Sequence, residues 1–202
     1  MFCTERGKKM KNADTDRRVR RTRDLLKRSL TQLLMKNDLK DITVSELTAL
    51  ADINRGTFYL HYKDIYDLFD QIEKEFIEDF AGIIALHKQR RGEVILLPVL
   101  LDAFKFIAAN ADVVIALLRT RESTLLTRII EMSRPRGIED WNHVFGGGDE
   151  VFFEYYYAFI TNGCVALLRR WLSQGMPESP EYMAELAGKM MSNAVRELRQ
   201  SV

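Results

Sequence analysis

A capping box, in which two residues at the start of a helix cap each other, is predicted near the beginning of this chain and constrains its fold more than any other feature. Thr43 is a favourable N-cap residue, and Glu46 follows it by three positions, so the pair forms a capping box. Ile42 and Leu47 occupy the two positions of a hydrophobic staple around the cap. The apolar residues that follow recur at helical spacing, which predicts a short helix that ends near Asp52.

A second short helix is expected after a turn of two residues. Asn54 is again a favourable N-cap, and Phe58 and Tyr62 lie four residues apart, on one face of the helix that it starts. The other positions carry hydrogen-bonding side chains on apolar stems, which suit phosphate oxygens and base edges alike. These are Arg55, Thr57, Tyr59 and His61. The segment therefore predicts a helix-turn-helix whose second helix faces a DNA groove.

The run Thr57-Phe58-Tyr59-Leu60-His61-Tyr62 resembles the end of the helix-turn-helix in the TetR family of transcriptional regulators. The resemblance covers roughly the first 80 residues at motif strength. It implies that Arg55 and Gly56 approach base edges, that Lys63 meets a phosphate, and that Phe58 packs inward. The full set of DNA-binding residues that we expect is Arg17, Arg18, Arg21, Thr43, Asn54, Arg55, Gly56, Thr57, Tyr59, His61 and Lys63.

Two positions depart from the pattern of that family. The turn carries Asp52 where glycine is usual, and aspartate adopts a left-handed backbone at some energetic cost. Ile65 stands where family members commonly place a lysine that reaches a phosphate. The resemblance therefore implies that DNA binding here relies more on Lys63 and on the arginines of the first helix.

Charge is distributed unevenly along the chain, although the net charge is only +1. Residues 1–63 contain 15 Lys and Arg against 8 Asp and Glu, whereas residues 64–202 contain 15 against 21. The densest basic cluster spans Arg17–Arg23, at the expected start of the first long helix after Thr15 or Asp16. Such a cluster is often only a solvated face; beside a helix-turn-helix, contact with phosphates is favoured.

The rest of the chain predicts helices throughout and gives an all-α fold. We expect a basic disordered arm over residues 1–14, a helix-turn-helix domain over residues 15–63, and a helical ligand-binding and dimerisation domain over residues 64–202. Within the last domain, a helix over 123–133 is expected to end at Pro135, and residues 136–149 are expected to form a loop.

The helix expected over residues 150–174 is apolar on all sides, which is typical of a helix that is buried all round. Residues 158–177 are also similar to a helix in the branch of the TetR family that includes regulators of dihydroxyacetone kinase operons. The resemblance implies that this helix and the last helix pair with their equivalents in a second subunit.

A small-molecule site is expected among apolar residues of the second domain: Phe104, Ile107, Leu118, Phe153, Tyr157 and Ile160, with Tyr157 as the polar group. The alternative, that these residues fill a solid core, carries nearly equal weight. Because aromatic residues abound and fixed charges are few here, we expect an apolar or aromatic effector over an anionic one.

Catalysis, metal binding and secretion are not indicated. The three histidines show no metal-ligand spacing, and no nucleophile stands in a recognised catalytic motif. Two cysteines far apart suit a reduced cytoplasm, and no signal peptide or membrane-spanning run is expected. No catalytic residue, cofactor or metal ligand is expected.

Together, these patterns predict a cytoplasmic repressor that binds a palindromic operator in double-stranded DNA as a homodimer and responds to a small-molecule effector. Two alternatives remain open. One is a co-activator or adaptor of TetR-like shape that acts mainly through protein contacts, and the other is an all-helical enzyme.

Overall fold

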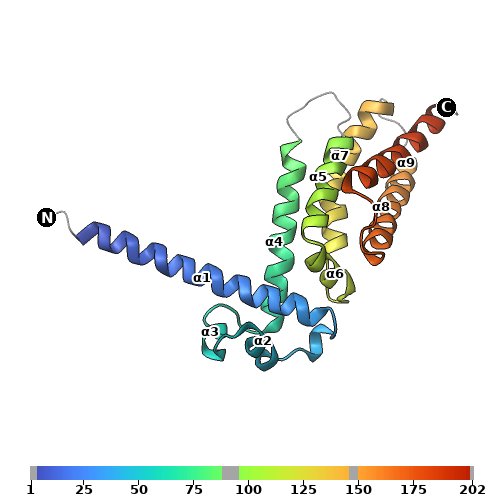
Figure 1. Cartoon of the computed structure of the whole chain (residues 1–202). Coiled ribbons are helices and arrows are strands. Elements are labelled where there is room, and N and C mark those ends of the chain that lie inside the picture. The colour runs from blue at the N-terminus through green and yellow to red at the C-terminus, as the bar shows by residue number, and fades with distance from the viewer. Residues whose placement is uncertain (1–3, 88–95, 146–149, 201–202) are drawn as a thin grey trace. The chain divides into compact units, whose positions relative to one another are not determined.

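The computed structural model describes residues 4–87, 96–145 and 150–200, and all regular secondary structure in these ranges is helical (Figure 1). The helices are α1 (Thr4–Leu34), the 3-10 helix η1 (Leu39–Asp41), α2 (Val44–Ala51), α3 (Arg55–Tyr59), α4 (Ile65–Leu86), α5 (Leu96–Ala109), α6 (Ala111–Arg119), α7 (Leu125–Phe145), α8 (Glu150–Ser173) and α9 (Pro180–Gln200). The all-α prediction is confirmed.

The chain divides into two compact units. Unit 1 comprises residues 1–74 and 119–121, and unit 2 comprises residues 75–118 and 122–202. The division falls inside α4, whereas the sequence predicted a boundary between residues 63 and 64. The physical reason is that the first half of α4 buries Leu68, Phe69 and Ile72, which contribute to the core of unit 1.

Unit 1 has an apolar core built from α1, α2, α3 and the start of α4. Leu26 and Leu30 of α1, Leu47 of α2 and Phe58 of α3 are fully buried. α2 packs against both α1 and α3. Phe58 therefore packs inward, as predicted.

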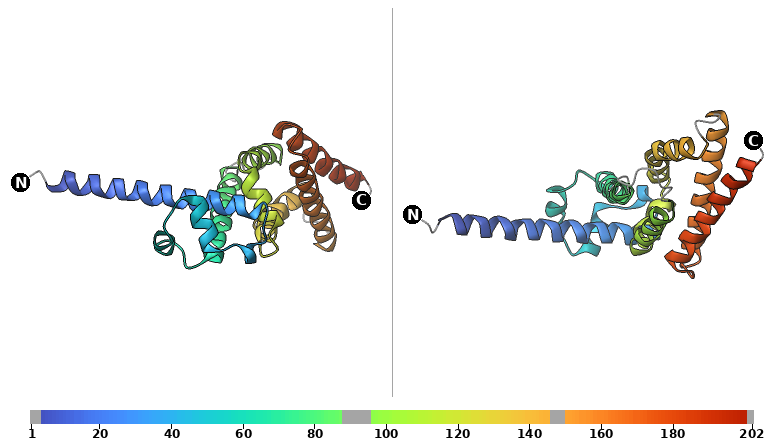
Figure 2. Two further views of the ribbon diagram at one scale, coloured as in Figure 1. Left: turned by 60° about the horizontal axis from the view of Figure 1, so that its bottom comes forward. Right: turned by 90° about the horizontal axis from the view of Figure 1, so that it is seen from above.

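Unit 2 is held by packing of α5 on α9, of α7 on α8 and of α8 on α9. The left and right views of Figure 2 both show α8 and α9 side by side. Phe104 of α5 meets the edge of Trp171 of α8 at 5.5 Å between ring centroids, and Met183 of α9 completes the cluster. The Trp171 Nε1 group donates a hydrogen bond of 3.0 Å to the Glu178 carbonyl, so this buried ring has its polar atom satisfied.

The first helix begins earlier than the sequence predicted. α1 starts at Thr4, so residues 4–14 are helical where a disordered arm was expected. This stretch contains no proline, and Lys, Met and Ala within it favour helix. Once the buried part of α1 fixes a helical start, each further turn toward the N-terminus adds hydrogen bonds at little cost.

The seventh helix also differs from the prediction, because it continues through Pro135 to Phe145. Residues 136–145 are helical where a loop was expected, and residues 146–149 lie outside the described ranges. A proline inside a helix removes one backbone hydrogen bond and disturbs the preceding turn. The carbonyl that loses its helical donor at Pro135 is that of Glu131. The neighbouring carbonyl of Ile130 accepts hydrogen bonds from the hydroxyls of Ser133 at 3.0 Å and Tyr157 at 2.7 Å, and the second of these joins α7 to α8.

The eighth helix corrects one further prediction. Residues 151–173 are long and apolar enough, by length and composition alone, to cross a membrane, although the sequence was expected to contain no such run. Within this chain α8 is not covered on every side, because of residues 151–173 only Phe153, Ile160, Trp171 and Leu172 are buried. That its other side packs against a second surface stays a prediction. An apolar helix with so little cover needs another surface to pack against.

Candidate nucleic-acid interface

The start of α2 is fixed by the capping box that the sequence predicted. The Thr43 Oγ1 atom accepts a hydrogen bond of 3.2 Å from the Glu46 backbone N–H, and Glu46 Oε2 accepts one of 3.0 Å from the Thr43 backbone N–H. Hydrogen bonds from the Thr43 backbone, and then from its side chain, lower the pKa of Glu46. The carboxylate is therefore ionised near the positive end of the helix, where negative charge is favourable.

The turn between α2 and α3 contains a residue with left-handed backbone. Asp52 has φ 53° and ψ 47°, and its N–H donates to the carbonyls of Ala49 and Thr48. The Ile53 N–H also donates to the Thr48 carbonyl, at 3.0 Å. These bonds close the turn with aspartate in the position that glycine would occupy without steric cost.

The second helix of the motif, α3, is shorter than the sequence predicted but presents the expected residues. Asn54 caps it by accepting a hydrogen bond of 2.7 Å from the Gly56 N–H. Phe58 is buried, and its ring lies 5.8 Å from that of Tyr62. On the outside, Arg55, Gly56 and Tyr59 are exposed, and Thr57 and His61 are half-buried. A rigid buried aromatic pair thus supports a polar outer surface.

Arg55 has a protein partner that the sequence did not reveal. Its guanidinium donates a hydrogen bond to the hydroxyl of Ser45, which lies on α2 ten positions earlier. Both side chains are exposed. The contact joins the two helices of the motif and restricts the rotamers that Arg55 can adopt. No spacing in the sequence indicates this pair, because it depends on the angle between α2 and α3.

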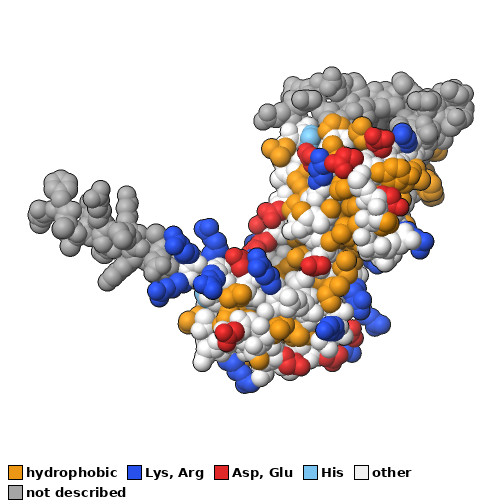
Figure 3. All heavy atoms as spheres, viewed as in Figure 1, with side chains coloured by type: hydrophobic (Ala, Val, Ile, Leu, Met, Phe, Trp, Pro, Cys, Tyr) orange, Lys and Arg blue, Asp and Glu red, His pale blue; other side chains and the backbone are white. Residues whose placement is uncertain are grey.

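The basic part of α1 supplies a second group of cations. Arg17, Arg18 and Arg21 are exposed, and Figure 3 shows Lys and Arg side chains gathered along this part of the helix. Arg23, which belongs to the predicted basic cluster but not to the expected set of DNA-binding residues, lies close enough to affect His61. Burial, followed by the positive charge of Arg23, lowers the pKa of His61. The structure therefore brings a cation of α1 beside the end of the helix-turn-helix.

The start of α4 explains the second departure from the family pattern. The Asp67 side chain accepts a hydrogen bond of 2.8 Å from the Lys63 N–H, and Asp64 accepts one of 2.8 Å from the Asp67 N–H. The Lys63 side chain is exposed, whereas Ile65 is buried. The side chain at position 65 therefore belongs to the core of unit 1, and Lys63 is the exposed cation at this helix start.

The six residues of the expected effector site do not form one cluster. Phe104 and Ile107 belong to the packed cluster around Trp171. Phe153 and Tyr157 stack on one another with ring centroids 5.5 Å apart, next to α7. Ile160 is buried and Leu118 is half-buried. For Phe104 and Ile107, the packing matches the solid-core alternative.

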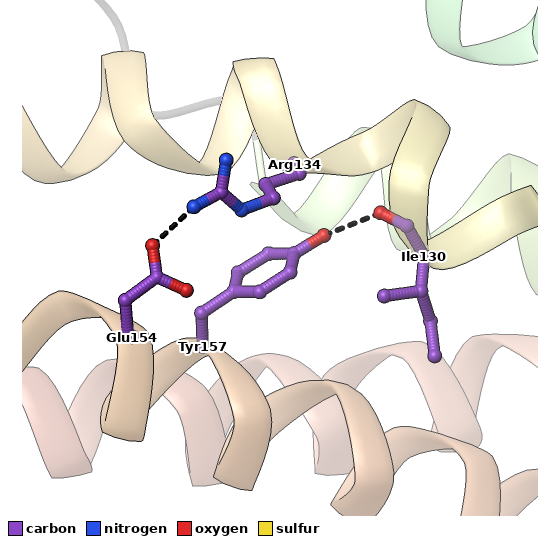
Figure 4. Close-up of polar contacts among 4 residues, drawn as sticks. All are labelled: Ile130, Arg134, Glu154 and Tyr157. Carbon is purple, nitrogen blue, oxygen red and sulfur yellow. Dashed lines mark hydrogen bonds and ion pairs between the residues drawn. The ribbon is translucent and has the colours of Figure 1, made fainter. Parts of the chain in front are cut away.

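Tyr157, the expected polar group of that site, is engaged within the protein. Its hydroxyl donates to the Ile130 carbonyl at 2.7 Å and lies 2.9 Å from the Ser133 hydroxyl. Burial raises the pKa of Tyr157, so the phenol stays protonated at neutral pH. Arg134 of α7 and Glu154 of α8 form an ion pair beside it (Figure 4). A ligand that bonded Tyr157 would have to compete with these partners.

Within the described ranges, no three His, Cys, Asp or Glu side chains gather in a way that would hold a metal ion. The closest polar pairing of a histidine there is His87 Nε2 with Asp102 Oδ2, at 2.9 Å. Burial raises the pKa of the Cys164 thiol, which disfavours the reactive thiolate.

Comparison with known proteins gives one family and several related chains. Residues 96–193 match a TetR family described as "Transcriptional regulator C-terminal region". A stretch of 63 residues, 31% of this chain, is 40% identical to the uncharacterized HTH-type transcriptional regulator YxbF of Bacillus subtilis (strain 168). The match spans 17% of the length of that relative.

Solved structures show the same fold over most of the chain. A TetR-like transcriptional regulator from Rhodococcus sp. RHA1 aligns with a TM-score of 0.66 at 16% identity, covering 87% of this chain and 96% of that one. The dihydroxyacetone kinase operon activator DhaS aligns with a TM-score of 0.56 at 16% identity, over 87% and 96% of the two chains. At such identities the likeness concerns the fold alone.

Proposed function

Because this chain belongs to the TetR family of transcriptional regulators, we propose that it binds a palindromic operator as a homodimer and represses transcription until a small-molecule effector releases it. Membership of this family places the chain among transcriptional regulators and not among enzymes. The cytoplasm, where the operator lies, is the proposed location.

The observation that carries the proposal is the outer surface of the helix-turn-helix. α2 and α3 are both capped, and the buried Phe58 and Tyr62 fix the shorter helix on the core of unit 1. Arg55, Gly56 and Tyr59 are then exposed on the outside of this helix. A short helix held in this way presents hydrogen-bonding groups to the edges of bases in a major groove.

We assign the DNA contacts to two classes. Arg55 and Gly56 approach base edges; Thr57, Tyr59 and His61 contact phosphates or a thymine methyl group. Phosphate binding also falls to Lys63 and to the exposed arginines Arg17, Arg18 and Arg21, while Thr43 and Asn54 cap the two helices near the backbone of the DNA. Base contacts give specificity, whereas phosphate contacts give affinity that falls as salt rises.

A homodimer is supported by the uncovered apolar surface of unit 2. On α8, Tyr155 and Phe159 are 74% and 72% exposed, and on α9, Tyr182 and Met190 are 55% and 57% exposed. Large apolar side chains gathered on adjacent helices are typical of an interface between protein subunits. A two-fold dimer also matches a palindromic operator, because each half of the operator receives one head.

An effector is proposed to bind in unit 2 near the ring pair of Phe153 and Tyr157. The two stacked rings favour an apolar or aromatic compound, and the ion pair of Arg134 and Glu154 lies beside them. To release the DNA, the compound must bind more tightly to the conformation whose heads no longer match the operator.

Selection from random duplex DNA tests the central proposal. At moderate salt, the full chain should recover one motif with two-fold symmetry. Arg55→Ala should relax specificity at one position of each half-site and cost about 1–3 kcal/mol, whereas Lys63→Ala should weaken all duplexes alike and lower the salt dependence. Arg128→Ala removes the same charge from an exposed site in unit 2 and serves as the control.

Three outcomes would change the proposal. Failure to recover any motif would favour an adaptor that acts through protein contacts. An unchanged sequence preference in Arg55→Ala would remove its role in base reading. Transcription from a reporter under the recovered operator should fall when the chain is expressed, and a rise instead would make the protein an activator. Addition of aromatic and apolar compounds to the complex then tests effector control.

A further inference from the structure

The hydrogen bond from Arg55 to Ser45 joins two side chains that both start from fixed backbone. Ser45 is the second residue of α2, whose start is held by the capping box of Thr43 and Glu46. Arg55 is the first residue of α3, whose start is capped by Asn54. α2 and α3 also pack against one another. The hydroxyl of Ser45 therefore stands at a fixed place, from which it holds the tip of the longer side chain.

The group that accepts this hydrogen bond is a neutral hydroxyl. The carboxylate next to it in the sequence, that of Glu46, is turned toward the cap. Its Oε2 atom accepts hydrogen bonds from the Thr43 backbone N–H at 3.0 Å and from the Thr43 hydroxyl at 2.8 Å. A carboxylate would compensate the positive charge of the guanidinium, whereas a hydroxyl does not. The bond therefore restricts the position of Arg55 and keeps its charge available to a nucleic acid.

Stability of the fold does not account for this contact. Both side chains are exposed, and water competes there for the same donors and acceptors, so a hydrogen bond between them adds little net free energy of folding. Holding a long side chain in one rotamer also costs conformational entropy. The restriction favours binding instead, because entropy that Arg55 has lost in the free protein is not lost again when it meets DNA.

The guanidinium of Arg55 keeps a complete pair of parallel donors. A guanidinium carries five N–H donors in one plane, and two of its edges each present such a pair. The Nη2 atom of Arg55 donates to Ser45 Oγ, which uses one donor of one pair and leaves the other pair intact. Two parallel donors match the O6 and N7 acceptors of guanine in the major groove, whereas adenine presents a donor at N6.

We propose that Ser45 is a positioning residue for Arg55, and that the guanidinium held in this way reads one guanine in each half-site of the operator. This role rests on the proposed DNA-binding function. It adds to that function the base that is read and a residue of α2 outside the expected set of DNA-binding residues. Ser45 acts through Arg55 and does not contact the base itself.

Selection from random duplex DNA, followed by affinity measurements, tests the base and the residue. The parent chain should recover guanine at one position of each half-site, and Arg55→Ala should remove that preference. Ser45→Ala should lower the ratio of affinities for guanine and adenine at this position about three- to tenfold, as expected when one long side chain must be ordered on binding. Ser45→Thr keeps the hydroxyl and should stay within about twofold of the parent ratio. Ser173→Ala removes an exposed hydroxyl from unit 2 and is the control.

A double-mutant cycle separates positioning from direct contact. In the Arg55→Ala background, Ser45→Ala should change the affinity for the operator by less than about twofold, because Ser45 then has no guanidinium to hold. An equal loss of affinity in the two backgrounds would show that Ser45 contacts the DNA by itself, and it would overturn the positioning role.

The motion of Arg55 in the protein without DNA gives a readout that does not depend on function. Nitrogen-15 relaxation of its side-chain Nε–H group should give a lower order parameter in Ser45→Ala than in the parent chain. Arg28, an exposed arginine of α1 in the same unit, is the internal reference and should not change. Because Ser45 is exposed, the variant should keep the urea midpoint of the parent chain.

The outcomes separate the positioning role from the proposed function. Equal order parameters of Arg55 in the two chains, or a guanine preference that Ser45→Ala leaves unchanged, overturn the positioning role and leave DNA binding standing. A motif whose Arg55-dependent position prefers another base overturns the guanine assignment. Recovery of no motif overturns the proposed function and the guanine assignment together.

Discussion

Gly137 is the position where the smallest change should have the clearest effect on stability. A Cβ atom at this residue would lie 3.2 Å from Tyr157 Cδ2 and 2.9 Å from Cε2, and the second distance is closer than Cβ atoms approach in proteins. The ring has little freedom to retreat, because its hydroxyl donates to Ile130 and its face stacks on Phe153. Gly137→Ala should therefore destabilise unit 2.

The size of the effect follows from three contributions. Displacing the ring weakens one buried hydrogen bond, worth about 1 kcal/mol. Crowding and an off-rotamer side chain add about 1–2 kcal/mol. Alanine is a better helix former than glycine, which offsets about 1 kcal/mol. The net loss is about 1–2 kcal/mol, equivalent to a decrease in Tm of about 2–8 °C for a chain of this length.

Urea unfolding followed by tryptophan fluorescence provides the measurement. Both tryptophans, Trp141 and Trp171, belong to unit 2, so the signal reports on the unit that contains Gly137. Gly82→Ala is the control, because Gly82 is exposed on α4 and a Cβ there meets nothing within 4 Å. This variant should gain up to about 1 kcal/mol.

A second variant separates the clash from other effects of alanine. In Tyr157→Phe the ring loses its hydrogen bond to Ile130 and can shift, so Gly137→Ala should cost less in that background than in the parent chain. If Gly137→Ala instead stabilises the parent chain as Gly82→Ala does, Tyr157 is not held against α7 and the reasoning is refuted.

Three further predictions concern unit 1. Asp52→Gly should raise the stability of unit 1 by about 1 kcal/mol, because glycine adopts φ 53° without strain. Urea unfolding followed by circular dichroism measures this, and an unchanged urea midpoint would show that the backbone of Asp52 is not strained. Thr43→Ala should lower stability by about 1 kcal/mol through loss of the capping box, while Thr43→Ser keeps most of it. Stability should also fall as pH drops below about 6.5, because the pKa of His61 is lowered in the folded state and the unfolded chain takes up the proton first. His61→Gln should reduce this pH dependence, and an equal slope in the variant would assign it to other groups.

Local chemistry made a large part of this protein predictable from sequence. The capping box at Thr43, the cap at Asn54 and the inward position of Phe58 depend on residues within a few positions of one another, so their spacing is enough to predict them. The TetR resemblance likewise rests on one contiguous run of six residues.

Two features depend on packing that the local pattern does not contain. Pro135 signals the end of a helix, yet α7 continues through it to Phe145, and the hydroxyl of Tyr157 that joins α8 to α7 bonds to Ile130, 27 positions away. Apolar residues around α8 signal complete burial, yet one side of that helix is uncovered within the chain.

The sequence by itself determined the helical class, the position of the helix-turn-helix and the family. Only the tertiary structure decided which side of each helix is covered and that Ile65 belongs to the core. It also decided that Arg55 donates a hydrogen bond to Ser45 and that the hydroxyl of Tyr157 donates one to Ile130 of α7. The physical reason is how far apart in the sequence the interacting residues lie. Caps and turns are set by hydrogen bonds between near neighbours, whereas burial and side-chain pairing depend on how helices far apart in the chain pack together.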